Sequence, residues 1–181
     1  STKKKEITMK KIYALKHLQR DELNLDVRLF DSINKCREEY NILLQPFKKD
    51  NQYFKVIEEG NDLALIESFS DALTFTNVIE IQTFTFKGFV GKYLDSVIYA
   101  NHSFDEEDNL YLFNDEKKAS KKFLDLLYEH REYGYNVENT TIKYNIYEQC
   151  IEYFDFNDDD DWGYCKTELI KVEGDNNNEN N

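Results

Sequence analysis

Cysteine, glycine and proline are all scarce in this chain, and each shortage narrows the class of protein. Its 181 residues include 3 Cys, 6 Gly and 1 Pro. The cysteines (Cys36, Cys150 and Cys165) are odd in number and show no Cys-x-x-Cys spacing, which argues against a disulfide framework and indicates a reduced, cytoplasmic setting. The remaining usage is biased toward Asn, Lys, Ile, Tyr, Asp and Glu. Such a bias is typical of AT-rich genomes, such as those of low-GC bacteria, their phages and mobile elements, or of eukaryotes with Asn-rich tails.

Long apolar runs are missing too. No stretch reaches the ~20 consecutive apolar residues that a membrane-spanning helix requires. Residues 1–5 are polar and basic, and no apolar segment follows them as it would in a secretory signal. We therefore expect a cytoplasmic protein that is not integral to a membrane.

Short catalytic motifs are the third absence. The chain contains no Gly-rich phosphate loop, no Gly-x-Ser-x-Gly turn and no His-Glu-x-x-His helix. Its many carboxylates are of the type used in acid-base or two-metal chemistry, but no motif fixes a pair of them. We therefore predict no enzymatic activity, no catalytic residues, and no metal or cofactor.

What the chain does have is enough apolar surface for a core. Hydrophobic residues make up 40% and aromatic residues 15% of the sequence, which argues against global disorder. The length suits either one large domain or two small ones.

An internal repeat is the main positive feature. In the first half, a strand pattern at 12–17 leads through Leu29-Phe30 to an amphipathic helix, and in the second half 98–102 leads through Leu112-Phe113 to another. Strand patterns then follow each helix, at 54–58 and 79–86 in the first half and at 144–148 and 164–172 in the second. The apolar stripes of the two helices match position for position: Cys36, Tyr40, Leu43 and Leu44 in one, and Ala119, Phe123, Leu126 and Leu127 in the other.

Helix ends are marked by capping and breaking residues. Pro46 predicts the end of the first helix, and Gly134 predicts the end of the second. The N-cap candidates, whose side chains accept from backbone N–H groups, are Asp31 or Ser32 and Asn114 or Asp115.

These patterns predict an α+β fold of two tandem, diverged strand-helix-strand repeats, each with a helix packed on a mostly antiparallel sheet. We expect a basic N-terminal tail at 1–8, repeat 1 at 9–90, an acidic repeat 2 at 93–173, and a disordered Asn-rich tail at 174–181. Both one-domain and two-domain arrangements are compatible with this pattern.

About fifty residues of the second repeat resemble a loose class of small β-α-β proteins of unknown function from bacteria and phages. In that class, a strand ending in His-Ser and an aromatic precedes a phenylalanine, a polar turn and a helix with Lys and Ala. The resemblance implies a fold and no activity. The residues that carry it are Tyr99, His102, Ser103, Phe104, Phe113, Asn114, Glu116, Lys117 and Ala119.

Charge is divided unevenly between the two halves. Residues 1–92 hold 15 Lys+Arg and 14 Asp+Glu, a net charge of +1, whereas residues 93–181 hold 8 and 22, a net charge of −14. Clustered Lys and Arg, which phosphate contacts need, occur only near the N-terminus, so we expect no direct nucleic-acid binding. The acidic excess either only solubilises the protein or forms a binding face for a basic partner. The candidate partner-binding residues are Asp105, Glu106, Glu107, Asp108, Asp158, Asp159, Asp160 and Asp161.

An acidic run and a pair of histidines are the two remaining candidate sites. Counted from Asn157, the acidic run resembles a calcium-binding loop, but Trp162 stands where the loop needs Gly and the flanks favour strands over helices, so we predict a solvated hairpin tip. His17 and His102 are predicted at equivalent strand ends, and no Cys or Ser accompanies either as a nucleophile would. We therefore expect both histidines to be structural.

The leading functional hypothesis is a small acidic inhibitor, encoded by a phage or mobile element, that blocks a basic nucleic-acid-binding protein of host defence. It would act as an anti-CRISPR or anti-restriction protein, with DNA mimicry as one form. The alternatives are an immunity protein or antitoxin that neutralises a toxin and, in a different class, a metal-dependent hydrolase.

Overall fold

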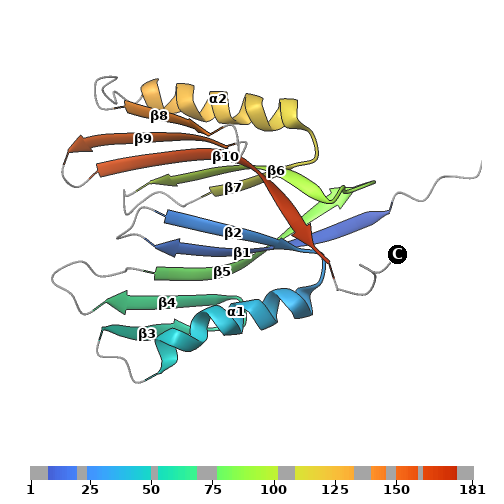
Figure 1. Cartoon of the computed structure of the whole chain (residues 1–181), viewed down its shortest axis with the longest axis vertical. Helices are drawn as coiled ribbons and strands as arrows, with labels where there is room; N and C mark the ends of the chain where they lie inside the picture. The colour runs from blue at the N-terminus through green and yellow to red at the C-terminus, as the bar shows by residue number, and fades with distance from the viewer. Residues whose placement is uncertain are drawn as a thin grey trace, which may run out of the picture. The chain divides into compact units, whose positions relative to one another are not determined.

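The computed structural model of the chain describes residues 8–19, 24–49, 53–68, 77–101, 109–132, 140–145, 150–158 and 161–174. These residues form two helices and ten strands in a mixed α+β fold whose strand pairs are mostly antiparallel (Figure 1). The chain divides into two compact units. Unit 1 comprises residues 1–92 and 171–181, and unit 2 comprises residues 93–170.

Unit 1 contains five strands and one helix. The sheet order is β3-β4-β5-β1-β2, and each neighbouring pair is antiparallel. In chain order the elements are β1 (Met9–Gln19), β2 (Asn24–Phe30), α1 (Ile33–Lys48), β3 (Phe54–Glu59), β4 (Leu63–Ser68) and β5 (Asn77–Lys87).

Helix α1 packs on one face of this sheet with the stripe that its apolar spacing predicts. Cys36, Tyr40 and Leu44 are buried against strand residues that include Leu15 and Ile79. The Tyr40 hydroxyl donates to the carbonyl of Gly60 at 3.0 Å, so its one polar group is satisfied.

The opposite face of the unit 1 sheet is apolar as well. Successive strand residues point to opposite faces, so Ile12, Ala14 and Leu18 lie on the side away from Leu15 and α1. All three are at most 6% exposed. Lys16 lies on this same face, buried at 8%, and its Nζ pairs with Glu80 Oε2 at 2.7 Å. The central strand β1 is therefore buried on both faces.

Unit 2 has the same number and kinds of elements. Its sheet order is β8-β9-β10-β6-β7. Ala119, Phe123 and Leu126 of its helix are buried together with Val97 and Cys165 from the sheet. In chain order the elements are β6 (Tyr93–Asn101), β7 (Asn109–Phe113), α2 (Glu116–Glu132), β8 (Thr140–Asn145), β9 (Cys150–Asp158) and β10 (Asp161–Glu173).

Capping fixes where both helices begin. Ser32 caps α1 and accepts from the backbone N–H of Lys35 at 3.4 Å. Asp115 precedes α2, and its Oδ1 accepts from the N–H groups of Lys117 and Lys118 at 2.9 and 3.1 Å. Of the candidate caps, Ser32 and Asp115 therefore supply the side-chain oxygens.

The predicted end of the first helix is wrong by two residues. Pro46 lies inside α1, which continues to Lys48. A proline this close to the end removes only its own N–H bond, to the carbonyl of Ile42, and the N–H of Lys49 still bonds to the Gln45 carbonyl at 3.3 Å. Helix α2 ends at Glu132, and the predicted stop at Gly134 lies outside the described residues.

The last described residues of the chain join unit 1. At the end of β10, Val172 and Glu173 pair in parallel with Leu29 and Phe30 of β2 (Figure 1). The Val172 N–H also donates to the Lys92 carbonyl at 2.8 Å. The strand pattern at 164–172 was predicted as part of repeat 2, whereas its end completes the sheet of unit 1.

The strand ladders correct one part of the predicted repeat. Ala14 lies opposite Leu29, and Ser96 lies opposite Leu112. Because Leu29 and Leu112 match in the sequence repeat, Ala14 corresponds to Ser96 and not to Ala100. By the same ladder register, Tyr99 corresponds to His17.

Burial follows this ladder correspondence. Positions 12, 14, 15 and 16 are buried, as are positions 94, 96, 97 and 98. Register in a strand is set by which side chains are buried, not by similar letters. The shared Ile-Tyr-Ala of the two strands is therefore offset by four residues in the fold.

Within the part of the chain that the structure describes, neither helix has the length and apolar character that crossing a membrane takes.

Candidate functional site

The eight predicted partner-binding acids lie almost entirely outside the described residues. Residues 105–108 fall between the ends of β6 and β7, and residues 159 and 160 fall between β9 and β10. Only the backbones of Asp158 and Asp161 are described, and they face each other where β9 ends and β10 begins. The acidic run is therefore flanked by two antiparallel strands, as predicted, and not by the two helices of a calcium-binding hand.

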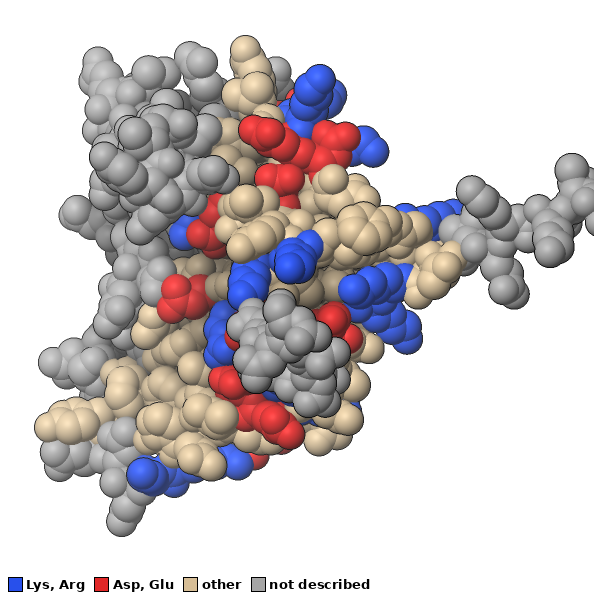
Figure 2. Space-filling model, turned by 45° about the vertical axis from the view of Figure 1, so that its right-hand side comes forward, with Lys and Arg blue, Asp and Glu red and all other residues tan. Residues whose placement is uncertain are grey.

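The described side chains of unit 2 carry nearly balanced charge. They comprise Asp95, Asp115, Glu116, Asp125, Glu129 and Glu168 against Lys117, Lys118, Lys121, Lys122 and Lys166. Four of the five lysines are on α2, where blue and red side chains lie next to one another at the top of Figure 2. The acidic excess of the second half thus comes from residues whose side chains lie outside the described set.

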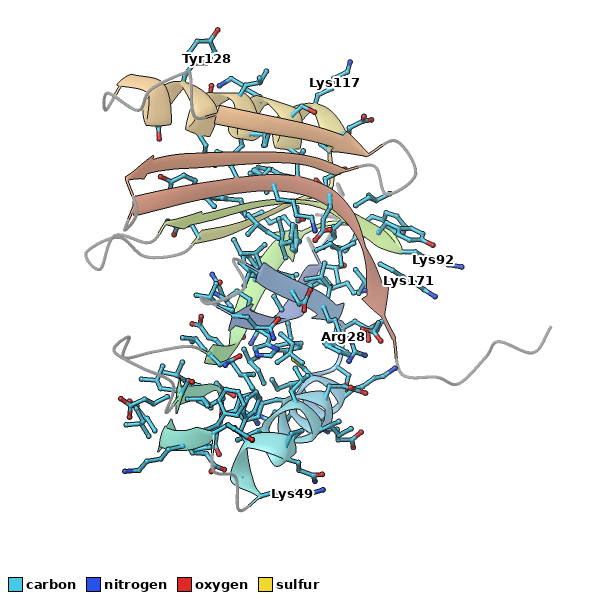
Figure 3. All side chains as sticks on the ribbon, turned by 60° about the vertical axis from the view of Figure 1, so that its left-hand side comes forward. Arg28, Lys49, Lys92, Lys117, Tyr128 and Lys171 are labelled. Atoms are coloured by element: carbon cyan, nitrogen blue, oxygen red, sulfur yellow. The ribbon has the colours of Figure 1, made fainter. Side chains whose placement is uncertain are left out.

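The best-defined charged cluster is in unit 1 and was not predicted from the sequence. Arg28 of β2 donates from Nε and Nη2 to the two carboxylate oxygens of Glu173, at 2.9 and 2.8 Å. Its Nη1 donates to Glu39 Oε2 of α1 at 2.7 Å. The guanidinium also lies 5.1 Å from the centre of the Phe30 ring, within the range of a cation–π contact. Figure 3 shows Arg28 beside the end of β10.

Electrostatics in this cluster are mutually reinforcing. The hydrogen bond from Arg28 holds the pKa of Glu173 below its usual value, and Lys35 and Lys171 act in the same direction. The hydrogen bond from Glu173 in turn raises the pKa of Arg28, which stays charged at any accessible pH. One cation is thus shared between two carboxylates.

Backbone contacts complete the attachment of the chain end. Lys35 Nζ donates to the Gly174 carbonyl at 2.8 Å, and the Asp31 N–H donates to the Glu173 carbonyl at 3.1 Å. With the parallel pairing on β2, these contacts hold residues 171–174 through both main chain and side chains. We call this segment the C-terminal strap. The Arg28 cluster holds this strap in place, and its charged groups pair with one another.

His17 is held by its surroundings in unit 1. Its Nε2 lies 2.8 Å from Asn77 Oδ1, and its ring meets that of Phe47 edge-on with centroids 6.1 Å apart. Phe47 in turn packs edge-on against Phe54. His17 thus belongs to an aromatic contact between α1 and the sheet. His102 lies outside the described residues, and the residue that matches His17 by ladder register is Tyr99.

The two described cysteines are buried thiols. Burial raises the pKa of both Cys36 and Cys165 to about 12. A thiol with so high a pKa is protonated near neutral pH and is a poor nucleophile. Within the described residues, no group of three or more His, Cys, Asp or Glu side chains is arranged to hold a metal ion.

The position equivalent to the Arg28 cluster is occupied differently in unit 2. Tyr111 of β7 stands where Arg28 does, and Lys122 of α2 stands where Glu39 does, both 83 residues further along the chain. Lys122 Nζ lies 4.4 Å from the centre of the Tyr111 ring. A salt bridge in unit 1 thus corresponds to a cation–π contact in unit 2.

Comparison with known proteins identifies no relative: no family model matches the chain, and neither a curated protein nor a solved structure matches it significantly.

Proposed function

We propose that this chain is a non-enzymatic, protein-binding inhibitor that uses the acidic residues of its second half to occupy a basic surface of a nucleic-acid-binding protein. The host-defence class is the target that we infer, in the manner of an anti-CRISPR or anti-restriction protein. One observation carries the proposal: a net charge of −14 is concentrated in residues 93–181 while residues 1–92 are close to neutral. Such an uncompensated field attracts and orients a cationic partner.

The placement of the acidic segments supports this proposal. Residues 105–108 connect β6 to β7, and residues 159–160 connect β9 to β10. Loops that join the strands of a rigid sheet are common places for recognition residues, because the sheet fixes their ends. Both segments could therefore present charge without disturbing the core of unit 2.

We also propose that the two units derive from one duplicated element, which then diverged in charge. Supporting this, both units have the order strand, strand, helix and three strands, and both sheets are ordered third, fourth, fifth, first and second. Divergence would leave unit 1 as the neutral partner of an acidic unit 2.

The test begins with affinity capture from a bacterial lysate and identification of the captured protein by mass spectrometry. Surface plasmon resonance then measures its binding to the wild type and to a variant with Asp105, Glu106, Glu107 and Asp108 neutralised. The matched control neutralises four exposed acids of unit 1, Asp31, Glu38, Glu58 and Glu59.

We expect a slower association for the unit 2 variant alone. We also expect association to slow as the Debye length falls from ~10 Å in about 0.1 M salt to ~3 Å in about 1 M salt. Association that ignores salt, with both variants binding like the wild type, would show that the acids only solubilise the protein. Capture of a toxin that binds no nucleic acid would favour an immunity protein.

A further inference from the structure

The C-terminal strap shows what the outer edge of β2 binds in unit 1. Three kinds of contact hold it: parallel backbone pairing with Leu29 and Phe30, the Lys35 bond to a main-chain carbonyl, and the Arg28 bond to a carboxylate. The edge of this sheet therefore accepts an extended segment that carries an acid.

The outer edge of β7 is the equivalent position in unit 2. Strand β7 ends the sheet order, and among the described strands it pairs only with β6. Leu112 and Phe113 of β7 stand where Leu29 and Phe30 stand in β2. The edge strand of a sheet presents N–H and C=O groups that can pair with another extended chain.

Side chains that hold the strap in unit 1 have counterparts beside this edge. Lys118 is the counterpart of Lys35, because it lies three residues after the cap Asp115 as Lys35 lies three after Ser32. Lys122 lies one helical turn after Lys118 on the same face of α2. Since Lys122 contacts Tyr111 of β7, this face of the helix is the one that borders the strand.

Charge at this edge favours an acidic occupant. In unit 1, Glu39 takes part of the positive charge of Arg28, whereas in unit 2 the Glu39 position holds Lys122. Among the described side chains of α2, Lys121 is ion-paired with Asp125, and Lys118 is exposed. Lys118 and Lys122 thus place two positive charges beside Tyr111, while the carboxylates of Asp95, Asp115 and Glu116 lie toward Phe113.

We propose that the outer edge of β7, bordered by Tyr111, Lys118 and Lys122, is a docking site for an extended acidic segment of a partner protein. The segment adds a strand beside β7 as the strap does beside β2. Its backbone pairs with Leu112 and Phe113, and its carboxylates meet Lys118 and Lys122. The lysines of this site are opposite in charge to the predicted partner-binding acids, so the site adds a second contact of opposite charge to the proposed inhibitor.

The test uses a fluorescein-labelled peptide, Val-Glu-Val-Glu-Gly-Asp, and the full chain, with binding measured by fluorescence anisotropy. Lys118→Glu is compared with Lys117→Glu, which makes the same charge change one residue away on a side chain that points away from the sheet in Figure 3. Losing one charge-assisted contact and adding repulsion should weaken binding about tenfold for Lys118→Glu. Lys117→Glu should change it less than about twofold, since only the general field is altered.

Two further measurements separate edge pairing from loose attraction. The peptide with Gln and Asn in place of its acids should bind more weakly, and a peptide with alternate N-methylated residues should not bind, because it cannot complete the ladder. Amide shifts in the nuclear magnetic resonance spectrum should concentrate at Leu112 and Phe113. Equal losses for the two lysine variants, or shifts confined to other strands, would overturn the proposal. So would self-association of the chain that Lys118→Glu abolishes, because it would place a second copy at this edge.

Discussion

The contact between β2 and α1 in unit 1 and the contact between β7 and α2 in unit 2 occupy the same place in the same arrangement of elements. In unit 1, Arg28 joins Glu39 of the helix to Glu173 of the strap, so strand, helix and chain end are fixed together. In unit 2, Lys122 lies over Tyr111, and no described strand pairs with the outer edge of β7. The two units thus share an order of elements but differ in the side chains beside this strand, where Tyr111 stands for Arg28 and Lys122 for Glu39.

The largest effects are expected in the two cores, where the helices of unit 1 and unit 2 should pack in the same way. Tyr40 and Phe123 hold matching positions in their helices and are 2% and 4% exposed. Replacing either with Ala should lower the free energy of unfolding by about 3 kcal/mol, because a buried aromatic side chain leaves a cavity. Thermal or urea unfolding measures this. A silent Phe123→Ala would mean that the two helices do not pack alike.

The strap should stabilise unit 1 alone. Deleting residues 171–181 removes the bonds of Val172 to Lys92, of Asp31 to Glu173 and of Lys35 to Gly174, and should cost about 2 kcal/mol. Hydrogen exchange should speed up in β2 and stay unchanged in β7. Deleting only residues 175–181 is the control and should have an effect within about 0.5 kcal/mol. Faster exchange in both units would show that the strap's effect is not local.

Arg28 and its counterpart Tyr111 should each affect only their own unit. Arg28→Ala leaves Glu39 and Glu173 without their shared cation, but all three side chains are partly exposed, at 42%, 25% and 30%. We therefore expect a loss of about 1 kcal/mol, toward the upper end for solvent-screened pairs. Tyr111→Ala should speed hydrogen exchange only in unit 2, whereas Arg28→Ala should do so only around β2 and the strap. Denaturant unfolding with exchange in each unit distinguishes these results.

Much of this fold follows from local patterns in the sequence. The stripe from Cys36 to Leu44 predicted the buried face of α1, and β-branched residues predicted β5, because periodicity reports which side of an element is covered. The end of α1 was missed because proline in a last turn breaks only one bond. The strand equivalence was missed because Ile-Tyr-Ala recurs four residues out of register, and only the ladder shows which side chains are opposite.

The anchoring cluster could not be predicted, for a different reason. Arg28 and Glu173 are separated by 145 positions in the sequence, and no periodic signal connects residues that far apart. One sequence signal did exist, because the charge at a matching position of the two helices changes from negative at Glu39 to positive at Lys122. The predicted acidic loops, by contrast, were inferred from charge alone, and their partner-binding role stays a prediction because their side chains lie outside the described residues.

The stability of unit 1 should depend on pH in acid because Glu173 titrates there. Its folded pKa lies below the usual value of 4.5, so its ionised form is favoured in the fold. The resulting stability is fully present above that value and is lost as the pH falls through the lower, folded pKa. The stability difference between wild type and Glu173→Gln should therefore be constant near neutral pH and shrink in acid. A difference that persists unchanged to low pH would mean that the glutamate acts by shape and not by charge.

The smallest expected effect is at Asp95, and its sign is opposite. By ladder register Asp95 stands in unit 2 where Tyr13 packs against the core cluster of unit 1. Burial raises the pKa of Asp95 above its usual value of 3.8, and the nearby carboxylates of Glu116 and Asp115 raise it further.

An acid whose folded pKa is raised costs stability when ionised, and that cost is relieved as the pH falls from above the folded pKa to below the unfolded one. Asp95→Asn removes the charge but keeps the shape, so it should stabilise the protein slightly at neutral pH and lose this advantage below about pH 4. Tyr13→Phe is the matched control in unit 1, because it changes the side chain at the corresponding position without removing a carboxylate. Urea unfolding across pH 3 to 7 checks both. A destabilising Asp95→Asn at neutral pH would show that this carboxylate makes a favourable contact in unit 2 that the tyrosine of unit 1 does not need.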